Sequence, residues 1–196
     1  MSIRIVGGSL KGRVISTLKT TRVRPTQNKH REAIFNILAP WLDWERSHVL
    51  DLFAGTGALG FEALSRGARK VTFCEKDRGQ AARIRGAAKE LGVENKCCVL
   101  LKDVRSLQFS ANDDEGEFDL IFADPPYDRA WGLKTLQCIH ERSWLSKGGV
   151  AVLETSSKEG EEIANSSLLT SLAPTLVNVK CKPYGDTQLW FFKRSE

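Results

Sequence analysis

The stretch DLFAGTGALG (Asp51–Gly60) decides the expected fold of this chain. It continues the short apolar run HVLDLFA and opens the helical pattern ALGFEALSRG, and its glycines are spaced as G-x-G-x-x-G. In a strand-to-helix turn, such glycines let the backbone approach a ligand closely, and the helix N-terminus favours an anionic group. The stretch therefore predicts the first unit of a Rossmann-like fold, with a ligand at Gly55 and Gly57.

Strands and helices alternate after this turn. The expected strands cover residues 48–54, 70–75, 97–101, 118–123 and 148–155, and the expected helices cover 58–67, 78–92, 131–145 and 159–172. The last two apolar runs, 175–181 and 187–192, are separated only by KPYGD and should form an antiparallel hairpin. The predicted fold class is therefore α/β, with a mostly parallel seven-stranded sheet that ends in an antiparallel hairpin.

A basic extension precedes this pattern. Residues 3–18 alternate loosely around glycines, as in a β-hairpin, and a helix is expected after Pro25 with Thr26 as its N-cap. Eight of the 29 Lys and Arg residues lie in residues 1–31, which hold no acid, so 21 basic residues face 24 acidic ones in the rest. Such asymmetry favours a polyanion-binding arm.

The basic residues of this arm are the expected phosphate contacts. We expect residues 1–45 to form a basic hairpin and helix extension that binds nucleic acid, and residues 46–196 to form the Rossmann-like domain. Arg31 lies on the apolar stripe of the expected helix and should instead pair with Glu32 or face the ligand cleft. The residues expected to bind RNA are Lys11, Arg13, Arg22 and Arg24.

Acids follow the second and third expected strands. Glu75 ends the second strand, where its carboxylate can accept hydrogen bonds from a ribose diol. Asp103 follows the third strand, where an adenine amino group would need an acceptor. In an open α/β sheet, ligands bind beyond the carboxyl ends of the strands, so both acids should lie beside the glycine turn. The glycine turn and Glu75 fit a dinucleotide as well as an adenosyl ligand.

The fourth expected strand decides between these ligands. FDLIFA (Phe118–Ala123) is followed directly by Asp124, Pro125, Pro126 and Tyr127. The Asp124 carboxylate and the Pro125 carbonyl can accept both N–H groups of an exocyclic nucleobase amine and aim its lone pair at an electrophile. S-adenosylmethionine offers an activated methyl group without a metal, and positioning then supplies much of the rate. Tyr127 can stack on the extruded base, which is worth about 1–3 kcal/mol.

The composition excludes several other classes of protein. The 196 residues are 41% hydrophobic and 27% charged, as in a soluble domain, and no apolar run is long enough to span a membrane. No signal-peptide pattern is present, so a cytoplasmic protein is expected. The five cysteines form no C-x-x-C pair and the three histidines are scattered, which predicts neither a disulfide framework nor a metal site.

Nearly the whole chain resembles the bacterial 16S rRNA guanine-N2 methyltransferases of the small-subunit methyltransferase D type. The resemblance lies in RIVGGSLKGR, RPTQNKHREAIFNIL, DLFAGTGALGFEALSRGA, CEKD and ADPPYD. It implies a class I adenosylmethionine-dependent methyltransferase domain at residues 46–196, and methylation of one guanine N2 in 16S rRNA or the small ribosomal subunit. We expect the protein to be a monomer. It implies cofactor binding by Asp51, Phe53, Gly55, Gly57, Glu75 and Asp103, and an active site at Asp124, Pro125 and Tyr127.

Three other functions remain open at this point. An adenine-N6 methyltransferase uses the same D-P-P-Y, but usually needs a target-recognition domain for which 196 residues leave no room. A glutamine methyltransferase would more typically carry asparagine at Asp124. A non-catalytic RNA-binding protein would keep the basic arm but would make Asp124 and Tyr127 coincidental.

Overall fold

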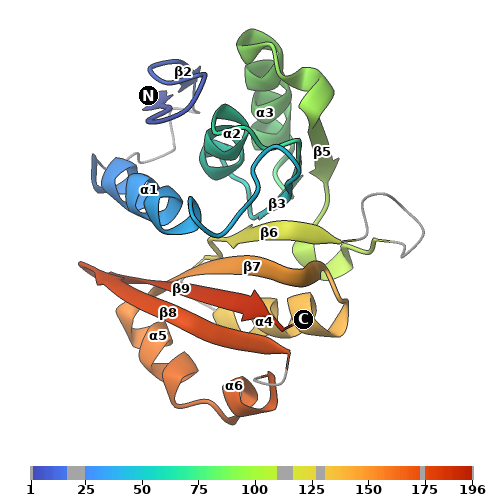
Figure 1. The fold of residues 1–196 in the computed structure, drawn as a ribbon. Coiled ribbons are helices and arrows are strands. Elements are labelled where there is room, and N and C mark those ends of the chain that lie inside the picture. The colour runs from blue at the N-terminus through green and yellow to red at the C-terminus, as the bar shows by residue number, and fades with distance from the viewer. Residues whose placement is uncertain (1, 17–24, 110–116, 127–130, 173–174, 196) are drawn as a thin grey trace. The chain divides into compact units, whose positions relative to one another are not determined.

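The computed structural model describes residues 2–16, 25–109, 117–126, 131–172 and 175–195. Contacts within the chain group it into two compact units, Met1–Val104 and Arg105–Glu196, and each is described by itself. Figure 1 labels the elements along the chain.

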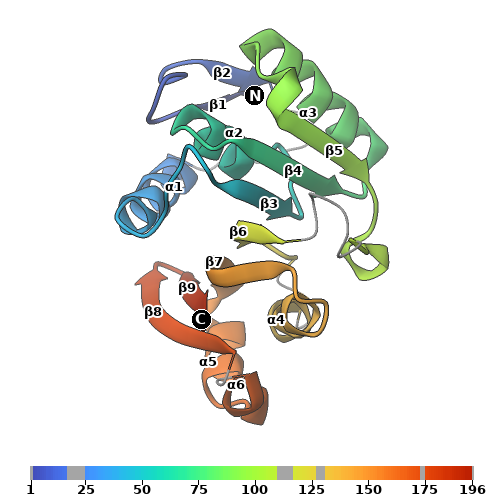
Figure 2. The same cartoon turned by 45° about the vertical axis from the view of Figure 1, so that its right-hand side comes forward.

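Three parallel strands form the centre of the first unit: β3 (His48–Leu52), β4 (Lys70–Glu75) and β5 (Cys97–Leu101). β4 lies in the middle, with Val71 opposite Val49 on one side and Cys97 on the other. β3 and β4 are almost wholly buried, which is typical of parallel strands covered on both faces. Helices α2 (Ala58–Ser65) and α3 (Arg78–Leu91) lie on one face of these strands (Figure 2).

Local sequence signals explain where α3 begins and ends. The Asp77 side chain accepts a hydrogen bond from the backbone N–H of Gln80 at 2.8 Å and so caps the N-terminus. Gly92 follows the last helical residue with φ 72°, a left-handed conformation that glycine adopts without steric cost. A short 3-10 turn (η1, Glu94–Lys96) then leads into β5.

The N-terminal extension belongs to the first unit. β1 (Ser2–Arg4) and β2 (Val14–Ser16) form the expected antiparallel hairpin, and α1 (Pro25–Leu38) follows. α1 begins at Pro25, so Thr26 lies inside the helix and the expectation that it is the N-cap was wrong. Proline is favoured in the first turn because its missing N–H has no intrahelical partner there.

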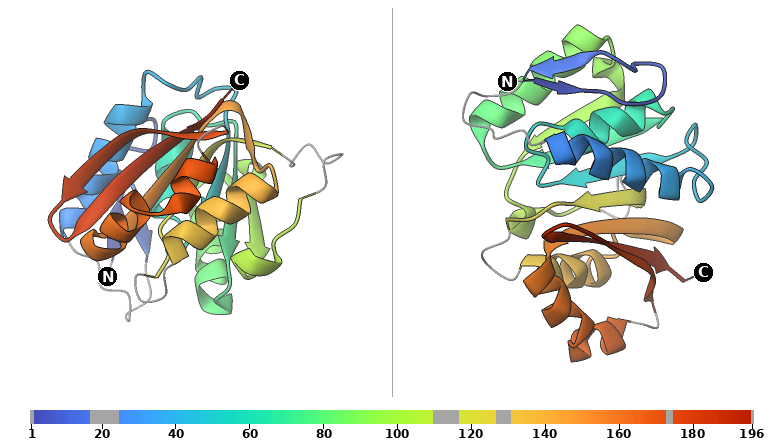
Figure 3. Two further views of the ribbon diagram at one scale, coloured as in Figure 1. Left: turned by 90° about the horizontal axis from the view of Figure 1, so that it is seen from below. Right: turned by 90° about the vertical axis from the view of Figure 1, so that its left-hand side faces the viewer.

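The second unit is built on four strands: β6 (Phe118–Ala123), β7 (Leu145–Ser156), β9 (Thr187–Arg194) and β8 (Leu176–Tyr184). β6 and β7 are parallel, whereas β9 is antiparallel to both β7 and β8. Figure 3 shows the helices of this unit gathered on one face of these strands. They are α4 (Trp131–Glu141), α5 (Ser157–Ala164) and α6 (Ser167–Leu172).

Two expected helix boundaries in this unit were wrong. α4 ends at Glu141 because Ser143 adopts φ 50°, and the N–H groups of Ser143 and Trp144 bond back to the carbonyls of His140 and Ile139. This is the Schellman pattern, here without the glycine that usually announces it. The single helix expected at 159–172 is two helices, α5 and α6, which the short polar residues Asn165 and Ser166 separate.

The predicted fold class is confirmed. The described strands comprise a small N-terminal hairpin and the seven strands of a mostly parallel sheet, of which the last two form an antiparallel hairpin. Within the described residues, no helix is long and apolar enough to cross a lipid bilayer.

Candidate active site

The glycine turn after β3 has an unusual backbone. Phe53, Gly55 and Gly57 all have positive φ, at 60°, 53° and 74°. Phe53 is the notable member, because a side chain makes this conformation uncommon. A Cβ at Gly57 would lie 2.9 Å from the ring of Phe61, so a side chain at Gly57 would have to displace that buried ring. The turn therefore depends on its glycines and keeps the backbone open to a neighbouring molecule.

Asp51 holds the turn against the start of α2. Its carboxylate is buried, with the residue 3% exposed, and accepts a hydrogen bond from the backbone N–H of Gly60 at 3.0 Å. Gly60 is in the first turn of α2, where backbone N–H groups lack intrahelical partners and favour negative charge. This bond fixes the helix relative to β3, and thereby fixes the turn between them.

Glu75 reaches the same turn from the end of β4. One carboxylate oxygen accepts from the backbone N–H of Gly55 at 2.7 Å, and the other accepts from Asp77 at 2.7 Å. A carboxylate offers about four lone-pair sites, so each oxygen can accept a second hydrogen bond. Glu75 thus orients the glycine turn and can still accept bonds from a bound diol.

Asp103 completes a group of three acids in the first unit. It is half-buried and lies two residues beyond β5. The acids gather around the buried thiol of Cys74: burial raises the pKa of this thiol to about 12, and the charges of Glu75, Asp103 and Asp51 add to the rise. The structure thus brings these three predicted cofactor residues together, and it keeps Cys74 a neutral thiol, as expected for a core cysteine.

The predicted active-site residues follow β6 in the second unit. Asp124 is exposed, Pro125 is buried and Pro126 is exposed, directly after the buried strand. Within this unit Ala123, the last residue of β6, is in register with Leu153 of β7. Tyr127 lies outside the described residues. The proline pair thus occupies the strand end at which the sequence placed it, and the catalytic roles stay predictions.

The predicted RNA-binding residues are described in part. Lys11 and Arg13 are exposed in the N-terminal hairpin, and the Arg13 guanidinium donates to the backbone carbonyl of Glu90 in α3 at 2.6 Å. Two of the four predicted residues, Arg22 and Arg24, lie outside the described residues. The four RNA contacts stay predictions.

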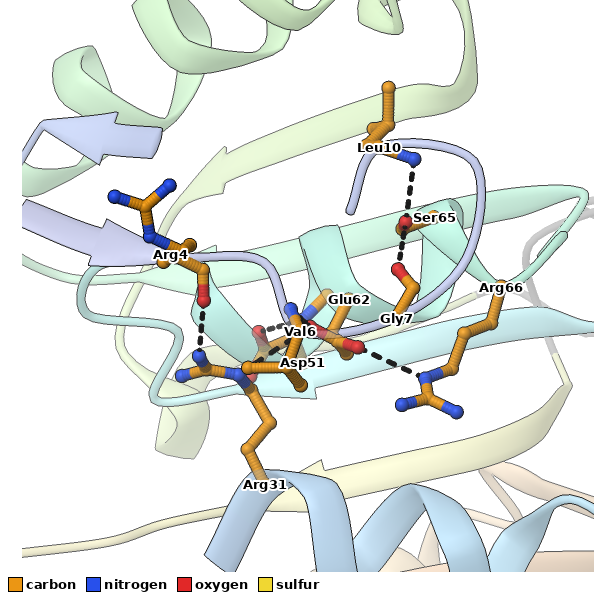
Figure 4. Close-up of polar contacts among 10 residues, drawn as sticks. Arg4, Val6, Gly7, Leu10, Arg31, Asp51, Glu62, Ser65 and Arg66 are labelled. Carbon is orange, nitrogen blue, oxygen red and sulfur yellow. Dashed lines mark hydrogen bonds and ion pairs between the residues drawn. The ribbon is translucent and has the colours of Figure 1, made fainter. Parts of the chain in front are cut away.

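Sequence reasoning missed a buried polar cluster on α2, which Figure 4 shows. Arg31 is 3.6 Å from the Glu62 carboxylate and donates to the carbonyl of Arg4 at 2.6 Å, so the expected alternative of a pair with Glu32 was wrong. Glu62 and Ser65 are buried beside the hairpin. The available signal was Glu62 itself, because a glutamate between Phe61 and Ala63 in a helix expected to pack on a sheet indicates a buried carboxylate.

Comparison with known proteins identifies the family. A family model described as Conserved hypothetical protein 95 matches residues 3–193. The ribosomal RNA small subunit methyltransferase D of Haemophilus influenzae is 34% identical over 154 residues, which are 78% of this chain and 78% of that protein. The chain belongs to this methyltransferase D family. The resemblance seen in the sequence motifs is thereby confirmed.

Solved structures agree with this assignment. The Escherichia coli protein described as "Putative methyltransferase yhhF" has a TM-score of 0.81 and 27% identity, covering 100% of this chain and 99% of that one. The 16S rRNA N2 G1207 methyltransferase of Thermus thermophilus, in complex with AdoMet and guanosine, has a TM-score of 0.71 and 22% identity. It covers 99% of this chain and 50% of that one, and it shows the shared fold alone.

Proposed function

We propose that this chain transfers a methyl group from S-adenosylmethionine to the exocyclic N2 amine of one guanine in 16S rRNA. The observation that carries the proposal is the glycine turn that Glu75 holds through Gly55, in a chain of the small-subunit methyltransferase D family. The proposal places the enzyme in the cytoplasm as a monomer that acts on 16S rRNA or the small ribosomal subunit.

The first unit fits the cofactor. When bound, S-adenosylmethionine supplies a methyl group that its sulfonium already activates, so the reaction needs no metal. Glu75 would accept bonds from the ribose hydroxyls, and Asp103 would accept from the adenine amine. The turn at Gly55 and Gly57 presents backbone rather than side chains. Three neighbouring carboxylates also suit a molecule that carries a sulfonium and an ammonium group.

The end of β6 fits the amine of the substrate. Asp124 and the carbonyl of Pro125 would accept the two N2–H groups, which holds the guanine amine in one orientation. Pro125 is buried, its ring restricts its own φ, and the following Pro126 restricts the ψ of Pro125, so the direction of that carbonyl is well defined. Tyr127 would stack on the guanine after the base leaves its helix or stack. These side chains bind and orient the nucleophile, and orientation of this kind supplies much of the rate.

Transfer of a tritiated methyl group to unmodified rRNA tests the proposal. The nucleosides of the product should contain labelled N2-methylguanosine, and the Asp124→Ala protein, loaded with equal cofactor, should transfer little. Labelled N6-methyladenosine would instead identify an adenine methyltransferase. A chain that retains S-adenosylmethionine but labels none of the RNA substrates (free rRNA, precursor particle or subunit) would be a binding protein, and the proposal would be wrong.

A further inference from the structure

The outer flank of α2 carries polar side chains that the proposed chemistry does not use. Glu62 is fully buried and Ser65 is 3% exposed, although both belong to a short helix that also packs on β3 and β4. Figure 4 shows that they point toward the N-terminal hairpin. We call Glu62, Ser65 and the neighbouring Arg66 the docking face of α2.

Ser65 binds the loop of the hairpin through two of its groups, the hydroxyl and the backbone carbonyl. Its hydroxyl donates to the carbonyl of Gly7 and accepts from the backbone N–H of Leu10, the latter at 2.9 Å. Its own carbonyl accepts from the backbone N–H of Ser9 at 2.6 Å. Ser65 is the last residue of α2, where carbonyl groups lack intrahelical partners. The hairpin loop therefore completes the C-terminal end of this helix.

Glu62 joins the hairpin to both neighbouring helices. One carboxylate oxygen accepts from the backbone N–H of Val6 at 2.9 Å and lies 3.6 Å from the guanidinium of Arg31 in α1. The other accepts from Arg66 at 3.0 Å. The Arg66 guanidinium also lies over the ring of Phe35 in α1, 4.9 Å from its centre. The hairpin, α1 and α2 thus meet at one buried carboxylate.

The hairpin glycines show how closely the loop lies on α2. Gly8 has φ 75°, and a Cβ there would fall 1.8 Å from the carbonyl oxygen of Ser65. A Cβ at Gly7 would fall 2.5 Å from the guanidinium of Arg66. The steric fit and the hydrogen bonds are independent observations, and both place the loop directly on the docking face.

The opposite end of α2 opens at the predicted cofactor turn. Gly57 is the N-cap of the helix, and Gly60 in its first turn is bonded to Asp51. The eight residues of α2 span about 12 Å at 1.5 Å per residue. One rigid helix therefore separates the cofactor turn from the point where the hairpin is anchored.

We propose that Glu62 and Ser65 are positioning residues that fix the RNA-binding hairpin at a set distance from the cofactor turn. The inference rests on the proposed function and on the prediction from the sequence that Lys11 and Arg13 contact RNA phosphates. Phosphate contacts set the register of a bound nucleic acid, so an anchored hairpin determines which guanine reaches the active site. A buried ion pair is weak evidence for stability, because burying both charges costs free energy, whereas specifying geometry is an attested role.

Ser65→Ala separates positioning from folding. Alanine is a better helix former than serine, so α2 should be kept, while the loop loses the two hydrogen bonds to the hydroxyl. In methyl transfer to rRNA we expect the KM for RNA to rise roughly 10-fold, with part of the label on other guanines. The Kd for S-adenosylmethionine, measured by calorimetry, should stay within about twofold of wild type. Ser195→Ala, the same change at an exposed residue, is the matched control.

Glu62→Gln is the second variant. The amide oxygen can still accept from Val6, but the amide N–H2 group would face a guanidinium, so the KM for RNA should rise again. An unchanged KM and methylation site in both variants would overturn the inference. So would a joint loss of cofactor affinity, because the docking face would then only support the cofactor turn.

Lys11→Gln and Arg13→Gln distinguish this inference from the proposed function. If these two substitutions raise the KM for RNA and the docking-face variants do not, the hairpin binds RNA but the positioning role of Glu62 and Ser65 is wrong. If they leave the KM for RNA unchanged, the hairpin does not bind RNA, and the positioning role is wrong with it. In either case, methyl transfer to guanine N2 is measured in the same assay and is judged separately.

Discussion

Replacing Glu75 should weaken cofactor binding by two routes. In the free protein its two carboxylate oxygens accept from the backbone N–H groups of Gly55 and Asp77, each at 2.7 Å. In the proposed complex the same oxygens also accept from the ribose hydroxyls. Glu75→Ala removes the ribose contacts and releases the glycine turn, so the cofactor would have to order the turn as it binds.

The magnitude follows from these bonds. A hydrogen bond to a charged group contributes about 1.5–3 kcal/mol, and an exposed donor that loses its partner recovers part of this from water. Gly55 is half-buried and Asp77 is exposed, so both N–H groups can be partly rehydrated. We expect a net loss of about 1–3 kcal/mol, which is about a 5- to 150-fold rise in the Kd for S-adenosylmethionine. Glu75→Gln should have a smaller effect in the same direction, because one acceptor oxygen remains.

Calorimetric titration with S-adenosylmethionine measures this effect, and denaturant unfolding confirms that each variant is folded. Asp77→Asn is the matched control, since asparagine caps a helix as well as aspartate and the change again replaces a carboxylate by an amide. Unchanged affinity in folded Glu75→Ala protein would remove Glu75 from the site. An equal loss in Asp77→Asn would show that the region responds to charge rather than to the bonds of Glu75.

Three further predictions concern other parts of the chain. Asp124→Ala should bind cofactor but lose roughly 10²- to 10⁴-fold in turnover rate. Tyr127→Phe should keep most of the activity, whereas Tyr127→Ala should not. An equal loss of activity in the two Tyr127 variants would give the phenol hydroxyl a chemical role. Burial raises the pKa of Glu159, so the folded state holds its proton more tightly than the unfolded state. Stability should therefore fall as pH rises from about 4.5 through the raised pKa, and thermal unfolding of Glu159→Gln should lack this dependence. A plot of log affinity for RNA against log salt should flatten by roughly 3 units, with cofactor affinity unchanged, when glutamine replaces all four of Lys11, Arg13, Arg22 and Arg24. If the fourfold variant kept the wild-type slope, the basic residues of the arm would be exposed to solvent without contacting RNA phosphates.

Local patterns in the sequence were enough to predict most of the fold. The glycine turn, the alternation of apolar runs with helical patterns and the proline pair after Phe118–Ala123 each act through neighbouring residues. Backbone sterics and side-chain periodicity therefore report them directly. For the same reason the end of β4, and with it Glu75, could be placed in advance. The strand expected at 48–54 ends earlier, at Leu52, but it does contain Asp51.

Local patterns failed where a boundary depended on packing. Nothing in the sequence near Ser143 signals a left-handed residue, yet α4 ends there, and buried Trp144 follows at once. α5 and α6 have one continuous amphipathic pattern, and the structure divides it at Asn165 and Ser166. At Ser143 the burial of the following Trp144 outweighs a helix propensity worth only tenths of a kcal/mol per residue. At Asn165 and Ser166 the short polar side chains compete locally with the helix.

Only the tertiary structure decided how the basic arm is held. Val6 and Glu62 are 56 residues apart, as are Ser9 and Ser65, and no periodicity in the sequence reports a contact over that separation. The sequence by itself determined that a basic hairpin precedes an α/β domain and that glycines shape its loop. Packing determined that a carboxylate on α2 would be buried against that loop. A buried carboxylate needs donors from every side, and only the folded chain brings a hairpin, α1 and α2 to the same point.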